Sequence, residues 1–68
     1  MKVKELLNKY NGEFYIYENV YNEHGYLIDN DCIADHNTPF NYLDKVRNRE
    51  IHDFSAGNFF LCIYLKDY

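Results

Sequence analysis

The sequence predicts a single α+β domain: a small antiparallel four-stranded sheet with two short helices packed on one face. Two observations support this class. Apolar residues recur with helical spacing in two segments, and they alternate with polar residues in four others. The expected order is helix, strand, strand, helix, strand, strand. A chain of 68 residues, 47% hydrophobic and 19% aromatic, is enough for one small core and only one.

The first helix is predicted near the N-terminus. Val3, Leu6 and Leu7 have the spacing of one helical face, which Tyr10 continues. Asn11-Gly12 then favours a helix end, because these residues tolerate left-handed backbone.

The first strand is predicted over residues 13–21, where side chains alternate. Phe14, Ile16 and Val20 fall on one face. Tyr15, Tyr17 and Tyr21 fall on the other. Residues 22–25 have turn composition, with Gly25 at the end.

A second strand is predicted over residues 26–34. Asp29, Asn30 and Asp31 interrupt its pattern, and central strands rarely hold three such residues. We therefore expect an edge strand, a bulge or a frayed end.

After a loop at residues 35–37, Thr38 and Pro39 predict the start of the second helix. Thr38 would be the N-cap and Pro39 the first helical residue. The spacing of the apolar residues that follow predicts two to three turns.

The last two strands are predicted at residues 50–54 and 59–65, joined by a turn at residues 55–58. The final strand alternates, so one set of side chains should face the core: Phe59, Leu61, Ile63 and Leu65. Phe60, Cys62 and Tyr64 should face the opposite way.

Charge is unevenly distributed along the chain. Residues 10–44 contain seven carboxylates and no lysine or arginine, while the flanks carry a net charge of +3. Six of the eight tyrosines lie in this acidic segment. A net charge of −4 and a pI near 5.1 argue against direct nucleic-acid binding.

The acidic segment predicts a binding surface for a basic protein. Tyrosines would supply rigid anchors, and carboxylates spaced along a hairpin would imitate nucleic-acid phosphates. The expected partner-binding residues are Tyr15, Tyr17, Glu18, Tyr21, Glu23, Asp29, Asp31 and Asp35. The alternative is a solvated hairpin whose charges only discourage aggregation.

No cofactor is expected, with zinc as the alternative. Cys32 and His36 have a spacing that zinc sites use, and His52 is a third candidate ligand. Against zinc, the chain has no CxxC pair, and a free cysteine is more often a small buried hydrophobe. Asp29-Asn30-Asp31 lacks the spacing and the distal glutamate of a calcium loop.

Enzymatic activity is not expected, because so small a domain has little room for a concave active site. Ser55 and Thr38 are accounted for by turn and capping roles. No apolar run reaches the length of a membrane span or a signal peptide, so we expect a cytoplasmic protein with reduced thiols.

The sequence also resembles the small accessory proteins of Firmicute prophages and mobile elements. The resemblance rests on an N-terminal Lys-x-Leu-Leu helix, a short hairpin, Tyr42-Leu43-Asp44, Arg49-Glu50-Ile51-x-Asp53-Phe54 and a hydrophobic last strand. It implies a protein that acts on host machinery, and anti-CRISPR proteins are one class with this profile. The implied partner is a host protein with a basic nucleic-acid groove, such as a Cas effector. A homo-oligomeric module, such as a homodimer, is the alternative.

Overall fold

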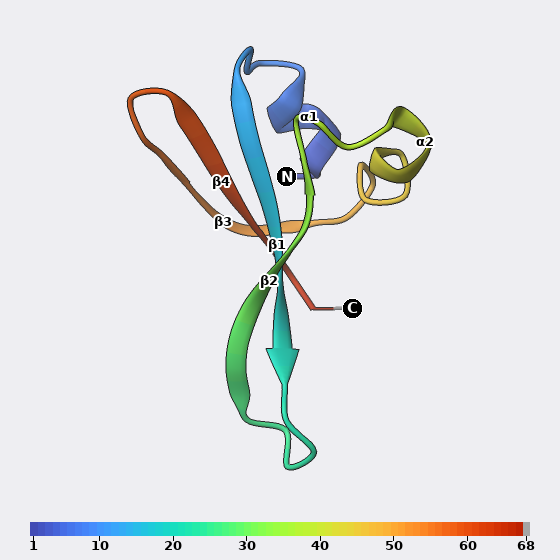
Figure 1. The fold of residues 1–68 in the computed structure, drawn as a ribbon, viewed down its shortest axis with the longest axis vertical. Helices are drawn as coiled ribbons and strands as arrows, with labels where there is room; N and C mark the ends of the chain where they lie inside the picture. The colour runs from blue at the N-terminus through green and yellow to red at the C-terminus, as the bar shows by residue number, and fades with distance from the viewer. Residues whose placement is uncertain (68) are drawn as a thin grey trace.

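The computed structural model describes residues 1–67 and has the predicted order of elements (Figure 1). These are α1 Val3–Leu7, β1 Glu13–Tyr21, β2 Leu27–Asp35, α2 Phe40–Leu43, β3 Ile51–Ala56 and β4 Phe60–Leu65. Within the described residues, no helix has the length and apolar character that crossing a bilayer requires.

The four strands form one mixed sheet in the order β2-β1-β4-β3. Each hairpin is antiparallel, but the central strands β1 and β4 run parallel, so the predicted all-antiparallel sheet is wrong at this pair. The register explains the arrangement. It sets Ile16 beside Ile63 and Phe14 beside Leu61, which brings the apolar sides of both strands onto one face.

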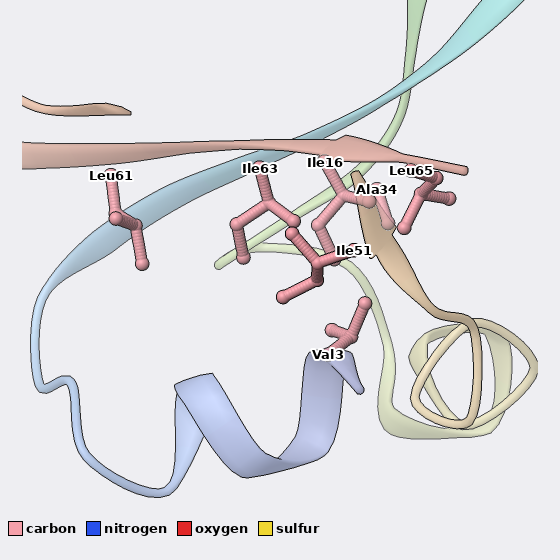
Figure 2. Close-up of a cluster of buried hydrophobic side chains, with 7 residues drawn as sticks. All are labelled: Val3, Ile16, Ala34, Ile51, Leu61, Ile63 and Leu65. Carbon is pink, nitrogen blue, oxygen red and sulfur yellow. The ribbon is translucent and has the colours of Figure 1, made fainter. Parts of the chain in front are cut away.

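The core lies between this face of the sheet and the helices (Figure 2). Its buried side chains are Val3, Ile16, Ala34, Ile51, Leu61, Ile63 and Leu65. The predicted core side of the last strand is confirmed for Leu61, Ile63 and Leu65. Phe59 is 82% exposed, because it belongs to the turn before β4 and not to the strand.

Helix α1 is attached to the start of β3 by main-chain hydrogen bonds. Val3 N–H donates to the Arg49 carbonyl at 3.0 Å, and Ile51 N–H donates to the Met1 carbonyl at 2.8 Å. The predicted apolar face is confirmed: Val3 is fully buried, and the three residues that follow its spacing pack partly buried against the core.

Helix α2 is shorter than predicted, and its cap differs. Pro39 occupies the N-cap position. Thr38 is not the cap, because its Oγ1 accepts a hydrogen bond from Asp35 N–H at 2.8 Å and closes the preceding turn. Leu43 and Val46 still pack against the core. The predicted apolar spacing therefore spans the short helix and the non-helical turns that follow it.

Strand β2 is an edge strand with two irregularities, as its interrupted pattern predicted. The register with β1 shifts between Ile16 and Tyr17 and again between Val20 and Tyr21. These shifts leave Ile33 and Ile28 as extra residues on β2. As a result, Ala34 pairs with Ile16 on the core side, while Cys32 pairs with Tyr17 on the opposite side.

Candidate functional site

The distal half of the β1–β2 hairpin projects beyond the rest of the sheet. Strand β1 pairs with β4 only over residues 13–17, so residues 18–31 form a two-stranded ribbon, here called the arm. Figure 1 shows the arm extending away from both helices. All residues from 23 to 32 are exposed, which leaves both sides of the arm accessible.

One side of the arm gathers three predicted carboxylates. Glu18 pairs directly with Asp31, and Asp29 pairs with Val20 two positions along, so all three side chains share a face. Like charges directly opposite each other are unfavourable in a sheet. Arg49 lies 3.6 Å from Glu18, whereas within residues 1–67 neither Asp29 nor Asp31 has an ion-pair partner within 4.0 Å.

The turn of the arm adds a fourth carboxylate and a group of apolar side chains. Glu23 lies in this turn, 3.5 Å from the ring of His24. Beside it, Tyr26, Leu27 and Ile28 are 70%, 54% and 61% exposed. Sequence reasoning did not select these three residues. The signal was present, because adjacent apolar residues at 27 and 28 break the alternation of a one-sided strand.

The first strand of the arm is held by polar contacts with the residues that follow β4. The Tyr21 hydroxyl donates a hydrogen bond to the Asp67 carboxylate, and Asn19 Nδ2 donates to the same group at 3.4 Å. The bond to Asp67 raises the pKa of the Tyr21 phenol, since it favours the protonated form. A cavity of about 440 Å³ opens here, lined by Asn19, Tyr21, His52, Leu65, Lys66 and Asp67.

Arg49 is the main cation at the base of the arm. Its side chain is only 12% exposed. Besides facing Glu18, its guanidinium donates to the Lys66 carbonyl at 3.0 Å. It therefore connects the arm, the segment before β3 and the end of β4.

The side of the sheet turned away from the helices is a second candidate surface, here called the open face. Its centre consists of Tyr15, Tyr17, Cys32, Cys62 and Tyr64. The rings of Tyr17 and Tyr64 stack with centroids 5.4 Å apart and planes inclined by 20°. Burial is the main cause that raises the pKa values of Tyr15 and Tyr17.

The structure thus divides the predicted partner-binding residues between two surfaces. Glu18, Glu23, Asp29 and Asp31 lie on the arm, together with Tyr21 at the end of its first strand. Tyr15 and Tyr17 lie on the open face. Asp35 is the last residue of β2, and its carboxylate accepts a hydrogen bond from Asn37 N–H at 2.8 Å in the turn that follows.

The three candidate zinc ligands lie on separate parts of the sheet. Cys32 is on the edge strand β2, and His52 is on the opposite edge strand β3, with β1 and β4 between them. His36 packs edge-on against Tyr15, with ring centroids 5.6 Å apart. No group of three His, Cys, Asp or Glu residues in the described chain is placed to hold a metal ion. A zinc site remains a prediction from spacing alone.

Comparisons with known proteins identify no relative: the chain matches no protein-family model, no curated protein and no solved structure.

Proposed function

We propose that this chain is a binding protein whose acidic arm enters a basic, nucleic-acid-binding groove of a host protein and inhibits it. The observation that carries the proposal is the arm itself. It is a projecting ribbon, exposed on both sides, that combines unpaired carboxylates with exposed apolar side chains. The sequence resemblance to mobile-element proteins suggests a bacterial cytoplasm as the setting and a Cas effector as one such host.

The chemistry of the arm suits a groove lined by lysine and arginine. Its carboxylates would replace phosphates at cationic sites, which releases counterions from the partner. Tyr26, Leu27 and Ile28 would fill apolar space between those sites, because exposed apolar groups rimmed by charge are typical of interfaces. Occupation of the groove by the arm would exclude the nucleic acid and would need no catalytic residue.

The test is a competition experiment with a purified Cas effector and its labelled guide or target nucleic acid. Addition of the protein should displace the nucleic acid, and displacement should weaken as salt is raised. The double variant Asp29→Asn/Asp31→Asn should lose at least about tenfold in inhibitory potency, since each lost charge pair in an interface is worth roughly 1 kcal/mol.

A matched control carries the same change in net charge away from the arm. Asp44 and Glu50 are exposed, and each takes part in a surface ion pair. The variant Asp44→Asn/Glu50→Gln should inhibit like the parent protein. Equal loss in both variants would reduce the effect to net charge and reject the arm as the site. A Cas effector that shows no displacement would reject that host class.

Self-association is the second candidate function, and strand β3 favours it. β3 is the other sheet edge, and Phe54 on it is 45% exposed. Unlike β2, this edge carries a single carboxylate, Asp53, so it has less charge to discourage pairing with a second copy. Light scattering decides the matter: a stable dimer insensitive to salt supports self-association, and a monomer excludes it.

A further inference from the structure

The charges of this molecule are sorted by layer as well as along the sequence. None of the four strands contains a lysine or arginine; all seven basic residues lie in the helices and connections. The strands therefore bring no lysine or arginine to the open face, and the two helices lie on the other side of the sheet (Figure 2).

The open face does carry carboxylates at its margins. Glu13 pairs with Phe60, Asp53 pairs with Tyr64, and Asp35 pairs with Tyr15, which places all three beside the central aromatic rings. After burial, the charges of Glu13 and Asp35 are the next causes that raise the pKa of Tyr15. The rings therefore sit in a negative local potential.

We infer that the open face is a docking platform for arginine side chains of a basic polypeptide, with the Tyr17–Tyr64 stack as its centre. A guanidinium is planar, stacks on aromatic rings and forms paired hydrogen bonds with carboxylates. The open face supplies both partners within one sheet: stacked phenol rings 5.4 Å apart and flanking carboxylates. An aromatic face could also stack nucleic-acid bases, but the carboxylates beside these rings would repel phosphates.

This surface is separate from the arm, and the inference does not depend on the arm's proposed role. The arm would act by insertion, through carboxylates on the core side of β1 and β2. The open face would act by stacking, through strands β1 and β4.

The probe is a pair of short peptides of equal charge, one alternating arginine with glycine and the other lysine with glycine. Binding to the isotope-labelled whole protein is followed by amide chemical shifts. The arginine peptide should bind at least about threefold more tightly, since lysine lacks the planar group. The amide chemical shifts that change on binding of the arginine peptide should belong to residues 15 and 17 of β1 and residues 62 and 64 of β4.

The variant Tyr17→Leu should lower the affinity for the arginine peptide by about fivefold, which is the contribution of one exposed cation–π contact. Tyr26→Leu is the matched control, since Tyr26 is 70% exposed and lies on the arm, and it should bind like the parent. The variant Asp29→Asn/Asp31→Asn should also keep peptide binding while losing competition with the Cas effector, which separates the two surfaces.

Three results would overturn the inference: equal affinity for the two peptides, shifts confined to the arm or the helices, or no saturable binding. If Tyr17→Leu fails to fold, as judged by circular dichroism, the peptide comparison and the shift map on the parent protein still decide it. The milder variant Glu13→Gln/Asp53→Asn then tests the carboxylates, and unchanged affinity would contradict their role.

Discussion

Ile16 and Ile28 belong to the same hairpin and have opposite surroundings. Ile16 is fully buried between the sheet and the helices, while Ile28 is 61% exposed on the arm. The difference follows from position along the hairpin: Ile16 lies between Ala34 of β2 and Ile63 of β4, whereas residue 28 lies on the arm, beyond the pairing with β4. Residue type alone therefore does not separate core from surface in this hairpin.

This pair gives a matched test of where the stability resides. Ile16→Ala should lower the free energy of unfolding by about 2–4 kcal/mol, because it leaves a cavity in a close-packed core. Ile28→Ala should change it by less than about 0.5 kcal/mol. Urea denaturation followed by circular dichroism measures both. Similar costs would mean that the arm is packed against other parts of the protein in solution.

Tyr17 makes stability depend on pH at the alkaline end. Burial raises its pKa above the ordinary value of 10.0, so the folded protein holds the phenol proton more tightly than the unfolded chain. The stabilisation is fully present below pH 10.0 and is lost as pH rises through the higher folded pKa.

Tyr17→Phe removes the phenol and keeps the stacked ring. The midpoint of urea denaturation is measured below and above the pH range in which the Tyr17 phenol titrates. Between these two pH values the midpoint should fall less in Tyr17→Phe than in the parent protein. Lysines and the other tyrosines titrate in both proteins, so the difference isolates Tyr17. Parallel pH profiles would show that the Tyr17 phenol is not perturbed on folding.

Among the elements, β1 is the one that the sequence specifies most completely. Its predicted bounds agree with the structure because apolar residues alternate with tyrosines over most of its length, with Glu18 as the one exception on the core side. The predicted faces of β4 agree for the same reason, apart from Phe59 in the turn. Local patterns of this kind depend only on neighbouring residues.

Pairing between elements is where prediction from the sequence failed. The parallel contact of β1 with β4 joins residues far apart in the chain, and no turn between them fixes its direction. The prediction of the candidate site was incomplete for the same reason. Alternation correctly separated Tyr15 and Tyr17 from the core side, and it places Glu18 with Ile16. It could not show that Asp29 and Asp31 join Glu18 on that side, because their faces depend on the bulges of β2.

The arm should open more readily than the central strands. Beyond residue 17 it has no third strand beside it, and a two-stranded ribbon is marginal in water. In hydrogen exchange, amides hydrogen-bonded between residues 19–21 and 27–30 should exchange at least about tenfold faster than those of β1 and β4 where they pair. Equal protection would contradict the independence of the arm.

At the scale of the whole molecule, one side chain connects segments that are remote in sequence. Arg49 reaches Glu18 on the arm and the Lys66 carbonyl after β4, and its own carbonyl accepts the hydrogen bond from Val3. Prediction from composition could not find this role, because nothing local distinguishes Arg49 from Arg47.

Arg49→Lys should therefore cost about 1–2 kcal/mol, since an ammonium cannot reproduce the divergent donors of a guanidinium. Arg47→Lys is the control: its pair with Asp44 at 3.8 Å lies on the surface and should matter by less than about 0.5 kcal/mol. Thermal melts of the two variants make the comparison. Equal melting temperatures would show that Arg49 contributes no more than a surface charge.

The uneven distribution of charge also gives the molecule a permanent electric dipole, with the arm at its negative end. The arm, residues 18–31, carries four carboxylates and no lysine or arginine, and all seven lysines and arginines lie outside the strands. In the field of a cationic body such a molecule experiences a torque before any contact forms. It would rotate until the arm leads, so that encounters begin with the arm already turned toward the partner.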